Sequence, residues 1–293
     1  MRVQTLPRPL SATLSDYISL TKPRITTMVV LTAAGGMWLA PGSIDPASAV
    51  GTLLTIALVV AAANALNCYL ERDSDRLMQR TARRPLPDQR LNPTSALWFG
   101  AALGVIAVTA LGILANPLTG VLGALALLSY VLVYTPMKKI TPQALLVGAI
   151  PGALPPLMGW TAATNQIQLP GVLLFALMFF WQIPHFIAIS IFRQEEYDRA
   201  GLKVYPSVLG LRIAKRDSFL YALLLFASSV AVYATGMSGL LYLVLATGLG
   251  LWFVGTAARG FWAKDDLVWS KKLFVVSLVY ISVLFPALIF DAV

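Results

Sequence analysis

The groups best able to do chemistry form a run of amides and carboxylates at the end of a long apolar segment. On a helix, four of these side chains share one face, namely Asn64, Asn67, Glu71 and Asp75. Asp73 points the opposite way. Carboxylates this close repel each other unless a cation lies between them, and oxygen ligands without sulfur or histidine suit Mg²⁺. The pattern therefore predicts a magnesium site on Asn67, Glu71 and Asp75, provided that the helix continues to Asp75.

A rigid basic stretch follows these acids. Arg80, Arg83 and Arg84 precede Pro85, and guanidinium groups bind phosphate oxygens through paired hydrogen bonds. Acids that hold a cation and arginines that hold phosphate together predict a diphosphate site. The spacing does not decide which of Arg83 and Arg84 is the more important.

A simpler interpretation of the same acids stays open. Glu71 and Asp75 could form ion pairs on a solvated helix end, with Arg72, Arg76 or Arg80 as partners. Such pairs would not require buried asparagines or the basic stretch that follows.

The elements that carry these residues are membrane spans. Hydrophobic residues make up 58% of the 293 positions and charged residues 12%, about half the charged fraction of a soluble domain. Such a composition predicts one all-α, polytopic membrane domain over residues 1–293, with a central cavity. A single cysteine excludes an internal disulfide, and a single histidine excludes a multi-histidine metal site.

Apolar runs bounded by charge, Pro or Gly predict about nine spans. They lie near residues 25–41, 48–70, 95–115, 118–135, 143–161, 170–192, 217–235, 238–258 and 272–290. In this arrangement all 22 Lys and Arg residues fall on one side, which predicts a cytoplasmic N-terminus and a C-terminus on the opposite side. The net charge of +9 then needs no nucleic-acid partner. Residues 1–24 lack the pattern of a removable signal, so the first span is expected to direct insertion.

Segments spread over the chain resemble the UbiA superfamily of intramembrane prenyltransferases, and more narrowly its haem-modifying branch. The resemblance runs from about residue 16 to residue 290. The segments are LTKPR at 20–24, NxxxExxxD at 67–75 with RTARRP at 80–85, YTPxKK at 134–139, PPLxGW at 155–160 and WQxPHF at 181–186.

The resemblance implies that a farnesyl group passes from farnesyl diphosphate to a vinyl group of haem B, with addition of water, to give haem O and diphosphate. Magnesium would be the cofactor, and Asn67, Glu71, Asp75, Arg83 and Arg84 the catalytic residues. Loops 71–94 and 193–216 would cap a site on the cytoplasmic side of a bacterial inner membrane. Membrane lipids and a downstream haem A synthase are the other expected partners. The residues expected to bind diphosphate are Arg80, Lys22, Arg24, Lys138, Lys139, Arg193 and Lys203.

The expected acceptor residues are His185, Glu196, Tyr197 and Trp181. On one continuous helix, His185 and Glu196 share a face. Two interpretations of His185 stay open: a buried hydrogen-bonding side chain, or a contact with haem through its iron or near the reacting vinyl group.

Two alternative functions stay open as well. One is a quinone- or chlorophyll-type prenyltransferase of the same superfamily, in which a second plain Asp-x-x-x-Asp motif is usual. Here Arg193, Glu196 and Tyr197 stand at that place, which leaves open whether one or two Mg²⁺ ions bind. The other alternative is a secondary transporter, although the acids lie at the membrane edge rather than at the midplane.

Overall fold

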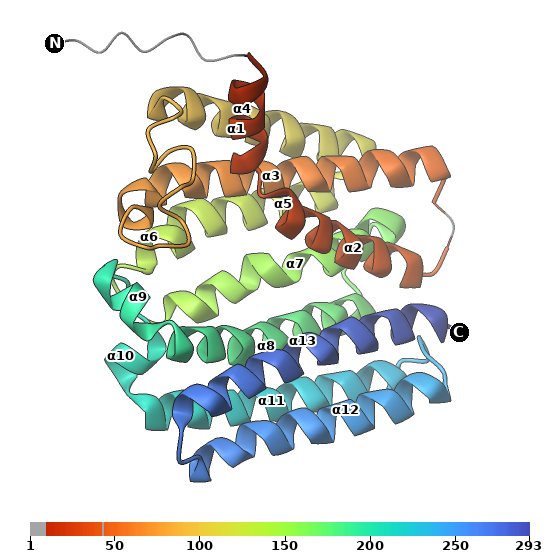
Figure 1. The fold of residues 1–293 in the computed structure, drawn as a ribbon. Coiled ribbons are helices and arrows are strands. Elements are labelled where there is room, and N and C mark those ends of the chain that lie inside the picture. The colour runs from red at the N-terminus through yellow and green to blue at the C-terminus, as the bar shows by residue number, and fades with distance from the viewer. Residues whose placement is uncertain (1–9, 43) are drawn as a thin grey trace, which may run out of the picture.

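The computed structural model describes residues 10–42 and 44–293, and these residues are almost entirely helical (Figure 1). Arg2 and Arg8, two of the 22 basic residues that the sequence analysis assigned to one side, lie outside them. The elements are α1 (Leu10–Leu20), α2 (Pro23–Leu39), α3 (Pro46–Asp75), α4 (Pro93–Leu114), α5 (Pro117–Leu128), the π-helix η1 (Ser129–Tyr134), α6 (Thr135–Met137), α7 (Ala144–Thr164), α8 (Leu169–Phe192), α9 (Gln194–Arg199), α10 (Tyr205–Leu209), α11 (Leu211–Ala234), α12 (Leu240–Ala258), the 3₁₀ helix η2 (Arg259–Trp262) and α13 (Asp266–Phe290). The expected all-α class is confirmed.

Eight helical segments of the described chain are long and apolar enough to cross a membrane. The expected count of about nine is reached only if α2 is included. This helix has 17 residues and a length of about 25 Å, somewhat less than the ~30 Å hydrocarbon core of a bilayer. The fourth predicted span is composite, because α5, η1 and α6 join into one segment, Pro117–Met137.

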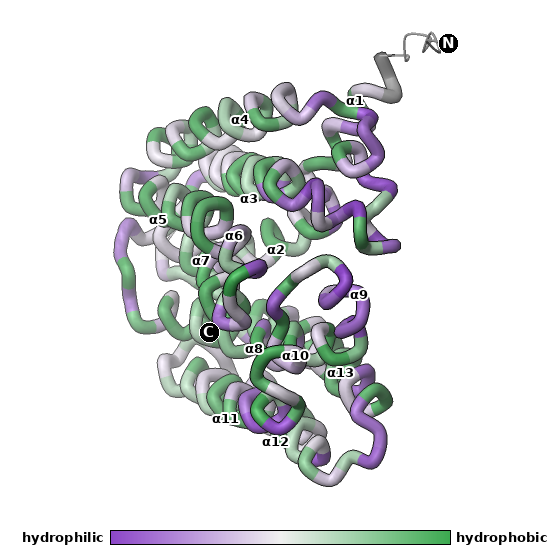
Figure 2. Tube along the Cα trace, turned by 90° about the vertical axis from the view of Figure 1, so that its left-hand side faces the viewer, coloured by the Kyte–Doolittle hydropathy of each residue, from purple (hydrophilic) through white to green (hydrophobic). Residues whose placement is uncertain are grey.

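Successive long helices run in alternating directions, and α2 and α13 both finish at the same end of the bundle (Figure 1). The connection from α3 to α4 and the segment with α9 and α10 lie together at the other end. Figure 2 shows hydrophilic residues in the connections, including those around α9, and mostly apolar residues along the spans. This arrangement brings the two loops that the sequence marked as a cap to one end of the molecule.

The crossing of α2 and α7 depends on two glycines. A Cβ atom at Gly36 would overlap the backbone of Pro156, and one at Gly159 would overlap the carbonyl of Ala33. The PPLxGW segment is thus a close contact between two helix backbones. It fixes α2, which begins directly after Lys22.

A cavity of about 1090 Å³ is lined by residues of α2, α3, η1, α7, α8 and α13. The buried apolar residues form two main clusters, one drawn largely from α8 and α11–α13 and the other from α3–α5 and α7. Side chains next to both clusters line the cavity, so the expected central cavity is present.

Candidate active site

The amide and carboxylate face predicted at the end of α3 is formed. The helix continues without a break to Asp75, and all four predicted side chains line the cavity, namely Asn64, Asn67, Glu71 and Asp75. Asp73 is exposed, with its side chain 68% accessible, and does not line the cavity. The geometric selection made from the sequence is confirmed.

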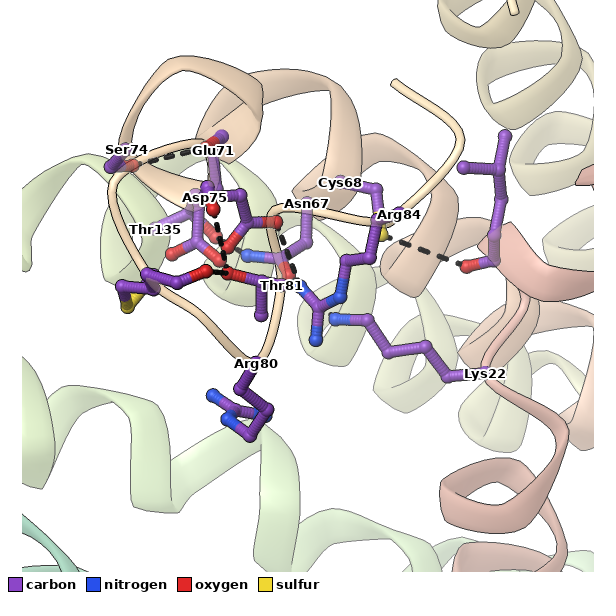
Figure 3. Close-up of polar contacts among 12 residues, drawn as sticks. Lys22, Asn67, Cys68, Glu71, Ser74, Asp75, Arg80, Thr81, Arg84 and Thr135 are labelled. Atoms are coloured by element: carbon purple, nitrogen blue, oxygen red, sulfur yellow. Dashed lines mark hydrogen bonds and ion pairs between the residues drawn. The ribbon is translucent and has the colours of Figure 1, made fainter. Parts of the chain in front are cut away.

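Both carboxylates pair with cationic side chains that also line the cavity, and Figure 3 shows one of these pairs, Arg84 with Asp75. Lys138 Nζ lies 2.6 Å from Glu71 Oε1, and Arg84 donates to Asp75 Oδ2 at 2.7 Å. Only 1% of the Asp75 side chain is accessible, so these are not pairs on a solvated helix end. The simpler interpretation named other partners, Arg72, Arg76 or Arg80, and does not describe this site.

The Arg84–Asp75 pair results from a tight fold of the loop that follows α3. The hydroxyl of Thr81 is buried and donates to the carbonyl of Asp75 at 2.8 Å. This bond turns the chain back toward the helix end and brings Arg84 over it (Figure 3). Arg83 is exposed, and its carbonyl accepts a hydrogen bond from Arg90. Of these two arginines only Arg84 lines the cavity, a position that favours Arg84 as the binding residue.

Lys22 enters the site from a strained backbone position. Its φ of 48° and ψ of 64° lie in the left-handed region, which costs a non-glycine residue of order 1–3 kcal/mol. Its Nζ donates to Asn67 Oδ1 at 2.8 Å. Burial lowers the pKa of this ammonium group, because a charge in a low-dielectric setting is disfavoured. This left-handed backbone conformation therefore places a desolvated ammonium group beside the predicted metal ligands.

The pKa of Lys138 is shifted in the opposite direction to that of Lys22. Burial acts against its charge, but the Tyr134 ring, 4.3 Å from Nζ, and the Glu71 carboxylate favour the ammonium form. The net result is a raised pKa. Lys138 therefore stays charged at the polar end of the cavity.

The orientation of the Asn67 amide is fixed by Thr135. Asn67 Nδ2 donates to Thr135 Oγ1 at 3.1 Å, and Thr135 Oγ1 donates to the carbonyl of Tyr130 at 2.8 Å. Because the hydroxyl hydrogen is used on Tyr130, the hydroxyl can only accept from Asn67. The amide oxygen must then face Lys22 and the cavity. Tyr130 lies in the π-helix η1, a conformation found often at functional sites.

Thr135→Val is expected to weaken magnesium binding by about 10- to 100-fold, as is usual when a partner that orients a metal ligand is lost. The Mg²⁺ dependence of turnover measures this. Thr135→Ser keeps the hydroxyl and should retain normal Mg²⁺ dependence. Thr55→Val is the matched control, since this buried hydroxyl bonds only backbone carbonyls of its own helix. Equal Mg²⁺ dependence in Thr135→Val and Thr55→Val would refute an orienting role.

The other predicted binding residues divide into two groups. Six of them line the cavity: Arg24, Arg80, Lys203, Tyr197, Trp181 and His185. Three lie outside the cavity lining, namely Lys139, Arg193 and Glu196.

The predicted common face of His185 and Glu196 is wrong. The helix α8 ends at Phe192, because Arg193 leaves the helical conformation with φ −118° and ψ 18°, and α9 begins as a separate helix. Glu196 instead pairs with Arg193 at 3.0 Å and accepts the backbone N–H of Arg80 at 3.4 Å. It ties the loop after α3 to the segment after α8.

A small apolar cluster joins the same two loops. Met78 packs with Ala200 and Leu202, and the backbone N–H of Lys203 donates to the carbonyl of Lys138 at 2.7 Å. Basic groups from separate elements are thereby held around one polar region.

His185 is both buried and part of the cavity lining. Its Nδ1 lies 2.7 Å from Ser277 Oγ, and its ring stacks on Trp181 with centroids 4.8 Å apart. Trp181 Nε1 donates to the backbone carbonyl of Ser277 at 2.7 Å. Only 8% of His185 is accessible, so the side chain is a buried hydrogen-bonding group that also borders the cavity.

Two residues that shape the site were not singled out in the sequence. Thr135 lies inside the YTPxKK segment, and the need of the buried Asn67 for a polar partner was the signal that could have found it. Ser277 had no such signal, since one serine in an apolar span is common.

The residues present fit a magnesium ion that arrives with diphosphate. Magnesium uses one or two carboxylates and completes its shell with water and phosphate oxygens. Glu71, Asp75 and the oriented oxygen of Asn67 provide such a set. Within the described ranges no group of three His, Cys, Asp or Glu side chains could hold a metal by itself, so an all-protein cage is not formed there.

The comparisons with known proteins define the class. The model of the UbiA prenyltransferase family matches residues 29–279, and the chain belongs to this family. It is 50% identical to the protoheme IX farnesyltransferase of Myxococcus xanthus, over 100% of this chain and 98% of that protein.

Solved structures agree on the fold. A structure of digeranylgeranylglyceryl phosphate synthase has a TM-score of 0.83 at 18% identity, covering 95% of this chain and 98% of that one. A UbiA homolog from Archaeoglobus fulgidus bound to GPP and Mg²⁺ has a TM-score of 0.69 at 18% identity, over 94% and 99% of the two chains.

Proposed function

We propose that this enzyme transfers a farnesyl group from farnesyl diphosphate to a vinyl group of haem B, with addition of water, to form haem O and diphosphate. The observation that carries the proposal is the full-length, 50% identity to a protoheme IX farnesyltransferase. The composition of the cavity supports it, because a polar end adjoins a large apolar region. Its volume of about 1090 Å³ is slightly above the ~300–1,000 Å³ common for small-molecule sites, as two bulky substrates require.

The polar end is suited to a diphosphate leaving group. Six basic side chains line the cavity against two carboxylates, which leaves an excess of positive charge for phosphate oxygens. Arg84 and Arg80 would each bind phosphate through two hydrogen bonds, while Lys22 and Lys138 add ammonium groups. Such fixed charges stabilise the negative charge that builds on the leaving group. Magnesium, held by Asn67, Glu71 and Asp75, would supply further neutralisation of the diphosphate.

The apolar region would hold the farnesyl chain and the porphyrin and keep water away from the reacting carbon. In the reaction the bond between the allylic carbon and the diphosphate oxygen breaks, and both electrons leave with diphosphate. The vinyl π-electrons of haem form the new carbon–carbon bond. Water adds to the resulting cation and loses a proton. Tyr130, Tyr134 and Trp181 line the cavity, and aromatic faces attract a passing cation.

The deciding experiment uses purified protein with haem B, farnesyl diphosphate and Mg²⁺, with product identification by mass. Haem O formation that requires Mg²⁺ is expected. Prenylation of a hydroxybenzoate acceptor in place of haem would favour the quinone-type alternative instead. Membership of a prenyltransferase family removes the transporter interpretation.

We further propose that the polar end of the cavity lies on the cytoplasmic side, where the Lys and Arg residues place it. Single cysteines at the exposed positions Asp88 and Glu195 should react with a membrane-impermeant thiol reagent from the cytoplasmic side only. A cysteine at the exposed Gln166 should react from the opposite side. The native Cys68 is buried and provides a low background. Labelling of positions 88 and 166 from one side would contradict the topology, and with it the cap formed by loops 71–94 and 193–216.

A further inference from the structure

The hydroxyl of Ser277 has one hydrogen, and the structure shows where it goes. Ser277 Oγ donates to the carbonyl of Phe274 at 2.6 Å. The carbonyl can only accept, so the hydroxyl must be the donor. Toward His185 Nδ1, at 2.7 Å, the same oxygen can therefore act only as an acceptor. It follows that Nδ1 of His185 carries a proton.

A neutral imidazole with a proton on Nδ1 has a bare lone pair on Nε2. His185 lines the cavity, and within the described residues Nε2 has no hydrogen-bond partner. In the described part of the chain, Nε2 is also not one of the solvent-inaccessible polar atoms that lack a hydrogen-bond partner. An unprotonated nitrogen is thus available to a molecule in the cavity.

The plane of the imidazole is also fixed. The ring stacks on Trp181 at an interplanar angle of 24° and lies 4.9 Å from the ring of Phe274. Trp181 is itself anchored on the carbonyl of Ser277. One residue of α13 therefore holds two neighbouring turns of α8 and leaves the ring little rotational freedom. A lone pair in a fixed direction is the arrangement that metal-binding histidines use, with the other nitrogen donating to an oxygen.

We propose that His185 Nε2 is an axial ligand to the iron of a porphyrin bound in the cavity, and that Ser277 is the positioning residue that fixes its tautomer. The proposal rests on haem being the acceptor, as inferred above. Imidazole is a common ligand of haem iron. Ligation through His185 would hold the porphyrin against α8 and α13, so that its vinyl groups, rather than its iron, are free to reach the allylic carbon. Rival ligands in the cavity lining include four thioethers, those of Met28, Met78, Met158 and Met178.

The tautomer can be tested without haem. His185 is the only histidine of the chain, so protein labelled with ¹⁵N-histidine gives one pair of ring-nitrogen signals. We expect a protonated Nδ1 and an unprotonated Nε2. In Ser277→Ala, the second tautomer should become populated. The reverse assignment in the wild type, with the proton on Nε2, would overturn the proposal.

Ligation is tested by comparing haem with metal-free protoporphyrin IX, which has no iron to bind. The wild type should bind haem more tightly than the metal-free ring, with the Soret and resonance Raman signature of a nitrogen ligand. His185→Phe keeps an aromatic ring in the stack and should bind both porphyrins equally. Ser277→Ala should lose about 10-fold of its affinity for haem, as for other residues that orient a metal ligand, without weaker binding of the metal-free ring.

Ser270→Ala is the matched control. Ser270 is buried on the same helix and makes the same bond to a carbonyl three residues earlier, but it has no bond to His185. It should retain the wild-type preference for haem. Haem binding with an unaltered spectrum in His185→Phe would overturn the ligation and leave the acceptor intact. Failure of the wild type to bind haem, with farnesyl diphosphate still bound, would refute the acceptor itself.

Discussion

Asp75→Asn is expected to lower kcat/KM for prenyl transfer by about 10²- to 10³-fold, the range found when one preorganised charge-stabilising group is removed from an active site. The substitution keeps the shape of the side chain and removes its charge. Asp75 is almost fully buried and bonded to Arg84 at 2.7 Å, so an amide there can neither neutralise this guanidinium nor serve as an anionic magnesium ligand. Steady-state kinetics at saturating Mg²⁺ measures the loss.

Asp73→Asn is the control for that experiment. Asp73 lies two residues earlier on the same helix, carries the same charge and is exposed to solvent, with Arg72 at 3.9 Å as its partner. Pairs of this kind contribute little to stability, so nearly full activity is expected. A loss in Asp73→Asn equal to that in Asp75→Asn would mean that net charge, rather than the cavity face, determines the effect. The melting temperatures of both variants separate lost chemistry from lost folding.

The features that the sequence predicted well are those set by local periodicity. The spacing of Asn64, Asn67, Glu71 and Asp75 fixes a common face as soon as the segment is helical, and no knowledge of other helices is needed. The spans follow from hydropathy for the same reason. The helix α2 differs from the other spans in length. It has only 17 residues, and closely packed glycines hold it against α7.

The features that the sequence could not predict depend on contacts between distant segments. Glu71 pairs with Lys138 across 67 positions of sequence, and Asn67 is oriented by Thr135 across 68. The break at Arg193 was missed because the sequence there contains no proline or glycine to end the helix. Glu196 turns instead toward the backbone of Arg80, a partner from another loop. Tertiary contact has overridden helical periodicity at this point.

Arg84→Gln is expected to reduce kcat/KM by about 100-fold or more, because a group that stabilises the leaving diphosphate is lost and the buried Asp75 carboxylate loses its cation. Arg83→Gln is the matched control, since Arg83 is exposed and does not line the cavity. It should retain most of the activity. Similar losses in the two variants would mean that the basic stretch acts through its net charge.

A double variant tests whether Arg84 and Asp75 act as a unit. Residues in direct contact do not contribute additively. The combination of Asp75→Asn with Arg84→Gln should therefore cost much less than the product of the two single losses, because each single change already breaks the same pair. Asp75→Asn combined with Arg83→Gln should instead multiply the separate effects, since no contact links these two side chains. Multiplicative losses in both combinations would show that Arg84 and Asp75 bind their ligands independently. The 2.7 Å hydrogen bond between them would then make no contribution to catalysis.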